Sequence, residues 1–144
     1  MASSNKQAGN EFEKDFAMIL AQEGFWAHIM QQSKAGQPSD IIAVKGRFHT
    51  LIDCKDISDP SKGFPFSRAE ENQRLAMDAF TKKGGEPCFF ALKFPDCSIR
   101  ILGYGRLKTL ESRGIKSITP KMMDSETWLF DDWLESVNVW AEGK

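Results

Sequence analysis

The 144-residue chain is predicted to be an α/β protein whose mixed β-sheet is flanked by helices. Two observations predict this class: helical periodicity near both ends of the chain, and short apolar runs between turn residues in its middle. The expected order is a helix, three strands, a helix, two strands and further helices, which pack naturally as a sheet covered by helices. A chain of this length buries roughly 70% of its unfolded surface, which suits a single domain over residues 1–144.

The expected elements follow from periodicity, turn residues and capping signals. In the first half they are a helix over 6–23, a strand over 25–32, a loop over 33–38 and a hairpin of strands over 40–44 and 48–54. In the second half they are a long loop over 56–66, a helix ending at 83, strands over 87–92 and 98–102, a short helix over 104–112, a strand over 115–118 and a last helix over 126–139.

Two local signals refine the helices. Ser67 and Glu70 have the spacing of a capping box, so the second long helix is expected to begin there and to end at Gly84-Gly85. The last helix carries an apolar stripe at helical spacing, which is interpreted as core rather than as a base-stacking surface. The stripe consists of Leu129, Trp133, Val137 and Trp140.

The composition indicates a protein that works away from membranes. Hydrophobic residues make up 41% and charged residues 27%, which is ordinary for a globular chain. No apolar run approaches the roughly 20 residues that span a bilayer, and the polar start of the chain does not resemble a signal peptide. The three cysteines lack paired or metal-site spacing and are expected to be reduced thiols. We therefore expect a cytoplasmic location.

Charge is segregated along the chain although the formal net charge is only −1. Residues 99–123 carry six basic side chains and one acid, whereas residues 124–144 carry six acids and one lysine. The field at a surface depends on the local arrangement of charges, so a near-neutral total does not exclude a basic face. Nucleic acid therefore remains a possible partner.

The strongest chemical signal is a set of two carboxylates and a lysine at the ends of the predicted hairpin. Asp40 begins one arm, and Asp53 and Lys55 end the other, so antiparallel pairing brings the two carboxylates together. Asp53 and Lys55 are two positions apart and share one face of their strand. Cys54 points the opposite way, and only its backbone carbonyl remains at the edge of the site as a possible ligand.

Two neighbouring carboxylates repel each other unless a cation joins them, and hard oxygen ligands suit Mg²⁺ or Mn²⁺. Such an ion acidifies a bound water and stabilises charge on an attacked phosphate, and Lys55 is placed to orient that water. On spacing alone two alternatives stay open. Asp40 can be a simple turn residue, and Asp53 with Lys55 can be an exposed cross-strand charge pair.

Residues around this hairpin match the pattern of a known nuclease family. Ser39-Asp40, Lys45-Gly46-Arg47-Phe48 and Asp53-Cys54-Lys55 correspond to a Thr-Asp strand, a Lys-Gly-Arg-Tyr turn and a Glu-x-Lys strand end. Weaker matches are Gly9-Asn10-Glu11-Phe12-Glu13, Ser61-Lys62-Gly63-Phe64-Pro65-Phe66, Gln73 and Gly114-Ile115-Lys116-Ser117-Ile118. The chain thus resembles the RecU family of Holliday junction resolvases, which have the PD-(D/E)xK core of restriction-endonuclease-like proteins.

The resemblance implies a role for each matching residue. Asp40 and Asp53 would be metal ligands, with Asp53 in place of the family's more usual Glu, and Lys55 would be the catalytic lysine. Glu13 on the first helix would complete the acidic cluster, directly or through a water, and Gln73 would reach the site from the second long helix. For Glu13 and Gln73 an ordinary surface position is the alternative.

The family also implies a homodimer that cuts branched DNA symmetrically, since a two-fold substrate favours a two-fold enzyme. RecU proteins carry a long stalk before the Thr-Asp strand, and only Gln31 to Ser39 stands there in this chain. In size it is closer to the stalkless nucleases of bacteriophages, which implies a bacterial or phage-infected cell. Phosphate contacts are expected from basic residues in the hairpin and the loops and helices around it: Lys34, Lys45, Arg47, Lys62, Arg68, Arg106 and Lys108.

Three functions remain open on the sequence. The first is a magnesium-dependent, structure-selective DNA endonuclease that resolves Holliday junctions or other branched DNA in recombination and repair. The second is a nuclease of the same core with a different DNA substrate. The third is a non-catalytic DNA-binding protein that retains the core, against which the intact set of Asp40, Asp53 and Lys55 argues.

Overall fold

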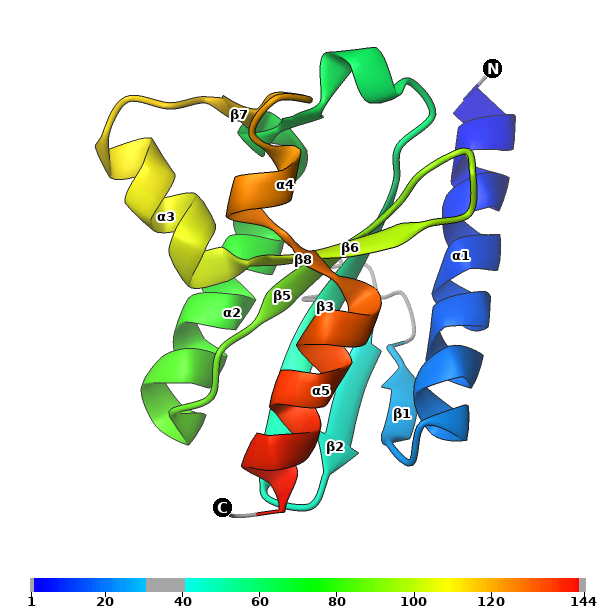
Figure 1. The fold of residues 1–144 in the computed structure, drawn as a ribbon, viewed down its shortest axis with the longest axis vertical. Helices are drawn as coiled ribbons and strands as arrows, with labels where there is room; N and C mark the ends of the chain where they lie inside the picture. Colours follow the sequence, from blue (N-terminus) through cyan, green and yellow to red (C-terminus); the bar gives the residue numbers. More distant parts are fainter. Residues whose placement is uncertain (1, 31–40, 143–144) are drawn as a thin grey trace.

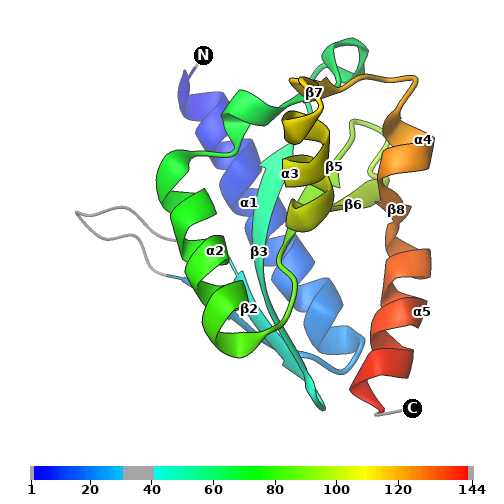
Figure 2. The same ribbon diagram turned by 90° about the vertical axis from the view of Figure 1, so that its left-hand side faces the viewer.

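The computed structural model describes the backbone of residues 2–30 and 41–142 and the side chains of residues 11–30 and 41–142. A six-stranded sheet in the order β1-β2-β3-β5-β6-β8 forms its centre. Helices α1 and α5 lie on one side of this sheet, and α2 and α3 lie on the other (Figure 1, Figure 2). The predicted class, a mixed sheet flanked by helices, is confirmed.

The described elements can be given in chain order. In the first half they are α1 (Ala2–Gln22), β1 (Trp26–Ile29), β2 (Ile41–Lys45), β3 (Phe48–Asp56), the 3₁₀ turns η1 (Pro60–Lys62) and η2 (Phe66–Arg68), β4 (Phe64–Pro65) and α2 (Glu71–Gly84). In the second half they are β5 (Phe89–Lys93), β6 (Ile99–Gly103), α3 (Tyr104–Ser112), β7 (Ser117–Ile118), α4 (Met123–Glu126), β8 (Trp128–Leu129) and α5 (Phe130–Ala141).

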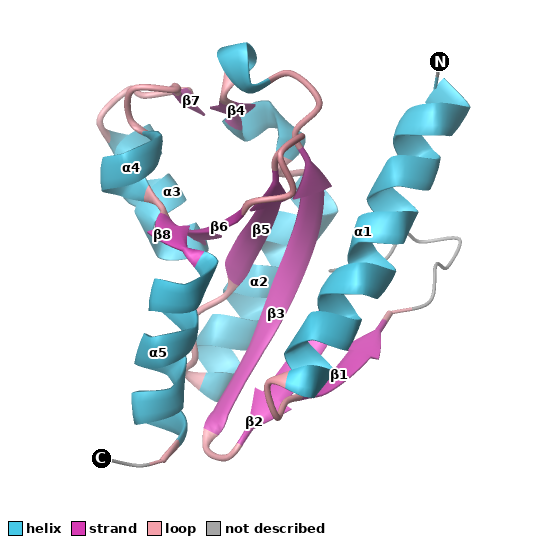
Figure 3. Cartoon of the chain, turned by 45° about the vertical axis from the view of Figure 1, so that its right-hand side comes forward, coloured by secondary structure: helices cyan, strands magenta, loops and turns pink. Residues whose placement is uncertain are grey.

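Strand β3 organises the sheet. It pairs antiparallel with β2 in a register that runs from Lys45↔Phe48 to Ile41↔Ile52, so the predicted hairpin is confirmed. Its other edge pairs parallel with β5, from Ile52↔Phe89 to Asp56↔Lys93. Among the described residues, the ladder with β2 reaches Ile52, and residues 53–56 of β3 pair with β5. The end of β3 that carries them is the end away from the hairpin turn (Figure 3).

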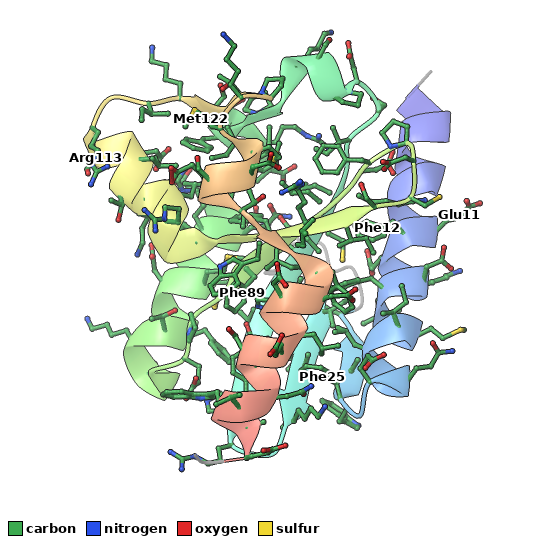
Figure 4. The ribbon with its side chains drawn as sticks, in the orientation of Figure 1. Glu11, Phe12, Phe25, Phe89, Arg113 and Met122 are labelled. Carbon is green, nitrogen blue, oxygen red and sulfur yellow. The ribbon has the colours of Figure 1, made fainter. Side chains whose placement is uncertain are left out.

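One face of the sheet is closed by α1 and α5. The apolar stripe of α1, formed by Phe12, Phe16 and Leu20, is buried against the strands as its helical spacing predicts. Trp133 of α5 is 2% exposed, and its ring lies parallel to that of Phe25 at a centroid distance of 6.1 Å. Figure 4 labels Phe12, Phe25 and Phe89 in this layer, whereas its Glu11 points out from α1 to solvent.

The opposite face is closed by α2, α3 and the short β4–β7 ribbon. Met77 of α2, Leu107 of α3 and Phe64 of β4 are fully buried in one cluster with Phe90 of the sheet. Pairing of Phe64 with Ile118 brings the segment after β3 back over this cluster. The expected strand over 115–118 therefore exists as β7, in a separate two-stranded ribbon rather than in the main sheet.

The expected start of the second long helix is wrong. Ser67 belongs to the 3₁₀ turn η2, and the capping box of α2 is formed by Glu70 and Gln73 instead. The physical reason is the ribbon contact: the Phe66 amide donates to the Lys116 carbonyl, and the Phe66 side chain is buried. This contact keeps residues 66–68 out of the helix, which therefore begins at Glu71. The predicted end is confirmed, because Gly85 is left-handed and its amide donates to the Thr81 carbonyl.

The single helix expected over 126–139 is also wrong, because α4, β8 and α5 replace it. Trp128 and Leu129 pair with Ile101 and Arg100 of β6, and this ladder interrupts the helical path. The predicted apolar stripe is correspondingly divided. Trp133 and Val137 are buried, whereas Leu129 and Trp140 are 48% and 51% exposed.

Two smaller expectations concern membranes and cysteines. Within the part of the chain that the structure describes, no helix combines the length and apolar character needed to cross a membrane. All three cysteines are free thiols: Cys54 and Cys88 are buried and Cys97 is exposed. Burial raises the pKa of the Cys88 thiol, which keeps this group protonated and unreactive at neutral pH.

Gly63 tests the β4–β7 contact. Its φ of +62° and ψ of −145° lie in a region that only glycine adopts readily, and a Cβ there would come within 2.0 Å of the Ile118 carbonyl oxygen. We expect Gly63→Ala to lower the free energy of unfolding by about 3 kcal/mol or more, measured by urea denaturation.

Gly85→Ala is the matched control. Gly85 also has a positive φ, but a Cβ at this position would meet nothing within 4 Å. The substitution should cost only the left-handed backbone penalty of about 1–2 kcal/mol. Equal destabilisation by both substitutions would contradict a steric role of the Ile118 contact.

Candidate active site

Asp53 is the buried acid at the centre of the candidate site. It lies near the end of β3 on the face that packs toward α2, and its side chain is 0% exposed. The Lys55 ammonium lies 3.2 Å from Asp53 Oδ2, with only 11% of its side chain exposed. Period-two alternation explains the pair, because residues two apart on a strand point the same way. A buried carboxylate costs several kcal/mol of desolvation unless a cation compensates it, and here that cation is Lys55.

Gln73 connects this pair to the start of α2. Its Oε1 accepts from Lys55 Nζ at 3.3 Å and from the Glu70 backbone amide at 3.2 Å. One amide oxygen thus orients the lysine and completes the capping box of the helix. The side chain is 7% exposed, so Gln73 is a buried polar residue of the site and not the ordinary surface residue that was its alternative.

Asp40 and Lys34 lie outside the described residues, so the structure places neither of them. Asp40 is bonded to Ile41, whose partner in the β2–β3 ladder is Ile52, the residue before Asp53. Cys54 faces away from Asp53, as the strand pattern predicts, because its side chain is buried in the cluster beneath α1 and α5. Its role as a carbonyl ligand stays a prediction.

Glu13 is half-buried on α1. That helix packs against β1, β2 and β3 through Phe12 and Phe16, on the sheet face opposite α2. Among residues 11–30 and 41–142, no group of three or more His, Cys, Asp or Glu side chains is arranged to hold a metal ion. The described residues therefore do not form a complete ligand set by themselves, and the place of Glu13 in such a set stays a prediction.

The predicted DNA contacts divide between the two ends of β3. Lys62 is exposed on η1, just beyond the Asp53 end, and Arg68 Nη2 donates to the Asp56 carbonyl at 3.2 Å. Lys45 and Arg47 lie at the hairpin turn instead. At about 3.3 Å per residue, Phe48, the partner of Lys45, is roughly 17 Å from Asp53 along the strand.

Lys45 also has a structural task that the sequence did not suggest. Its ammonium donates to the Glu23 carbonyl at 2.5 Å and to Asn138 Oδ1 at 2.6 Å, and it lies 5.3 Å from the centre of the Phe25 ring. It therefore joins α1, β2 and α5 at the hairpin end of the sheet. Phosphate binding by Lys45 would have to compete with these contacts, so its predicted DNA role is the least supported of the set.

The two basic residues of α3 are exposed and carry surface ion pairs. Arg106 Nη1 lies 3.6 Å from Glu126 Oε1, and Lys108 Nζ lies 3.0 Å from Asp78 Oδ1. The Lys108–Asp78 pair is exposed on both sides and contributes at most about 1 kcal/mol, so a phosphate can displace this acid at little cost, whereas Glu126 is only 20% exposed and its Oε1 is buried. Their predicted contact with DNA remains compatible with the structure.

Sequence reasoning missed the roles of Glu70 and Arg74 in holding the start of α2 in place. Arg74 makes a two-point ion pair with Glu111 of α3, including Nη1 to Oε2 at 3.0 Å, and the guanidinium lowers the pKa of Glu111. The spacing of Glu70 and Gln73 matches a capping box with an unusual first residue. No local signal joins Arg74 to Glu111, which lies far along the chain.

Comparison with known proteins places this arrangement in a family. The family model described as archaeal Holliday junction resolvase (Hjc) matches residues 4–129. The chain belongs to this family. A solved structure of Hjc from Archaeoglobus fulgidus, described as a Holliday junction resolvase from an archaeal hyperthermophile, matches with a TM-score of 0.67 and 22% identity. The match covers 88% of this chain and 99% of the Archaeoglobus protein. No curated protein matches the chain.

Membership in the Hjc family gives the activity at a coarse level. The chain is a Holliday junction resolvase, a structure-selective endonuclease that binds branched DNA and acts in recombination and repair. Metal dependence is general for resolvases of this family. The mixed sheet flanked by helices agrees with the fold of the Archaeoglobus protein.

A substitution at Gln73 tests the link between the helix cap and the lysine. We expect Gln73→Met to slow junction cleavage by roughly tenfold while DNA binding persists, because Lys55 loses its acceptor without a change of side-chain length. The free energy of unfolding should fall by about 1 kcal/mol with the loss of the cap. Single-turnover cleavage and urea denaturation measure the two effects.

Glu70→Ala is the control, since it removes the other half of the capping box but leaves the Gln73 oxygen beside Lys55. It should reproduce the loss of stability with near-normal cleavage. Equal slowing of cleavage by both variants would show that Gln73 acts only through the helix.

Proposed function

We propose that the protein makes paired, magnesium-dependent nicks in four-way DNA junctions, with Asp40 and Asp53 as ligands of the ion and Lys55 beside the attacking water. The observation that carries this proposal is the buried contact of Asp53 with Lys55, which Gln73 orients from α2. Burial of a carboxylate and an ammonium together near the end of a strand has no packing benefit, which points to chemistry.

The donor set fits a hard divalent cation. Asp53 supplies carboxylate oxygens in a dry environment, the Cys54 backbone supplies a carbonyl oxygen, and Asp40 and Glu13 would add further carboxylates. Mg²⁺ prefers such oxygen ligands and keeps several waters, and Mn²⁺ accepts the same set. When bound, the ion supplies a more acidic water and compensates charge on the attacked phosphate.

Lys55 and Gln73 then act on the reacting groups. The ammonium of Lys55 can donate to the attacking water or to a non-bridging phosphate oxygen as the P–O bond to the leaving strand breaks. Its contact with Asp53 also offsets part of the negative charge of that carboxylate. Gln73 keeps the ammonium at the site by accepting one of its three protons in a hydrogen bond.

The finer features of the proposal concern assembly and origin. A four-way junction presents equivalent strands related by a two-fold axis, so two copies of the chain would place two Asp53 sites symmetrically on it. We propose a homodimer on this ground. The RecU-like, stalkless, phage-type character suggested by the short segment from Gln31 to Ser39 also remains a proposal, as does action in the cytoplasm of a bacterial or infected cell.

The test is cleavage of a labelled four-way junction beside a linear duplex of matching sequence. We expect symmetric nicks in opposite strands of the junction with Mg²⁺ or Mn²⁺, no cleavage with EDTA, and little cutting of the duplex. Asp53→Asn should slow cleavage by about three orders of magnitude, since it removes a metal ligand without changing side-chain size.

Asp56→Asn provides the control. It makes the same chemical change on the same strand, but residue 56 points to the face of the sheet opposite to Asp53. Its cleavage should remain close to normal. Cleavage by Asp53→Asn at the normal rate would exclude the proposed site. Equal cutting of junction and duplex would keep the site but contradict the preference for junctions.

A further inference from the structure

A second concave site lies at the opposite end of the sheet from Asp53. It is a groove of about 310 Å³ between α5 and the starts of β3 and β5. Phe48, Phe89 and Trp133 line its floor and are buried, whereas Trp128 and Trp140 are 46% and 51% exposed. This volume lies at the lower end of the range of ligand pockets, and the aromatic lining is typical of them.

Two buried polar atoms of this groove lack a hydrogen-bond partner within the described part of the chain. One is Nε1 of Trp133, which belongs to a side chain only 2% exposed, and the other is Oε2 of Glu86 in the loop before β5. Buried indole N–H groups and carboxylate oxygens are nearly always paired, because each unpaired group costs a significant desolvation free energy. The residues that line the groove thus include one indole donor and one carboxylate acceptor without a partner, among aromatic rings.

These atoms define the chemistry of an occupant. The Trp133 N–H requires an acceptor such as a main-chain carbonyl, and the Glu86 carboxylate requires a donor, best a cation. The rings around them favour an apolar side chain or the flat face of a guanidinium. A segment with an apolar residue next to an arginine or lysine satisfies all three requirements.

The surroundings favour an extended occupant over a small molecule. Trp128 also lines a neighbouring polar cavity of about 470 Å³, which contains Arg100 and Asp132. Trp128 belongs to β8, the last strand in the sheet order, so one edge of β8 is unpaired among the described strands. An exposed strand edge between two cavities is suited to a peptide that adds main-chain hydrogen bonds.

Charge separates this site from the DNA-binding surface. Asp131, Asp132 and Glu135 are exposed on α5, the helix that forms one wall of the groove, and would repel phosphates. The same acids attract a basic segment. We propose that the groove between α5 and β5 binds an extended peptide of a partner protein in which an apolar residue neighbours an arginine or lysine.

Three short fluorescein-labelled peptides test the proposal by fluorescence anisotropy with the full chain: leucine alternating with arginine, with glutamate and with serine. The arginine peptide should bind saturably and the other two should not. Glu86→Gln should weaken binding by roughly tenfold or more, and Trp133→Phe by about fivefold, since each removes one hydrogen-bonding partner. Junction cleavage should be unchanged in both variants, which also shows that they fold.

Glu135→Gln is the matched control, because it removes one exposed acid of α5 that does not line the groove. It should weaken peptide binding far less than Glu86→Gln does, since it removes only a long-range attraction. An equal loss of peptide affinity in Glu135→Gln and Glu86→Gln would show that the peptide is held only by general attraction to acids. That result would overturn the proposal.

Three other results would also overturn it. Displacement of the peptide by junction DNA would make the groove part of the DNA surface. Competition by arginine methyl ester at the same concentration as the peptide would indicate a small-cation site. A change of oligomeric state in Glu86→Gln, measured by sedimentation velocity, would identify a second copy of the chain as the occupant.

Discussion

The burial of the Asp53 carboxylate is the constraint on which the site depends. A charge at 0% exposure is tolerated only where a cation and a rigid scaffold compensate it. Lys55 supplies the cation at 3.2 Å, and the central strand β3, paired with β2 over residues 48–52 and with β5 over residues 52–56, supplies the scaffold. The same strand places Asp53 directly after Ile52, the last residue of β3 that pairs with a described residue of β2.

Helix α2 is fixed to this site by polar contacts at its first turn. Gln73 joins the cap of the helix to Lys55, and Arg74 joins the helix to Glu111 of α3. The pairing of Phe64 with Ile118 holds the preceding segment in the ribbon, so the helix begins only after it. Gln73 and Arg74 therefore lie near the end of β3. A change in the loop between β3 and α2 would therefore be transmitted to the lysine through the position of Gln73.

Features set by local periodicity could be predicted, and features set by distant pairing could not. Alternation along the hairpin placed Asp53 and Lys55 on one face and Cys54 on the other, and helical spacing placed Phe12 and Phe16 in the core. The helical path is interrupted at Trp128 because this residue pairs with β6, which is separated from it in the sequence by α3, β7 and α4. No local pattern indicates that pairing, so the apolar stripe suggested one continuous helix. The contacts of Lys45 with Glu23 and Asn138 likewise join segments that no local pattern relates.

The most direct test of the central claim is a titration of Mn²⁺ by electron paramagnetic resonance in the absence of DNA. It separates metal binding at Asp53 from every later step of cleavage. We expect saturable binding by the unaltered protein and by Asp56→Asn, with loss of that binding in Asp53→Asn. Undiminished Mn²⁺ affinity in a folded Asp53→Asn protein would contradict the assignment of this carboxylate to the metal.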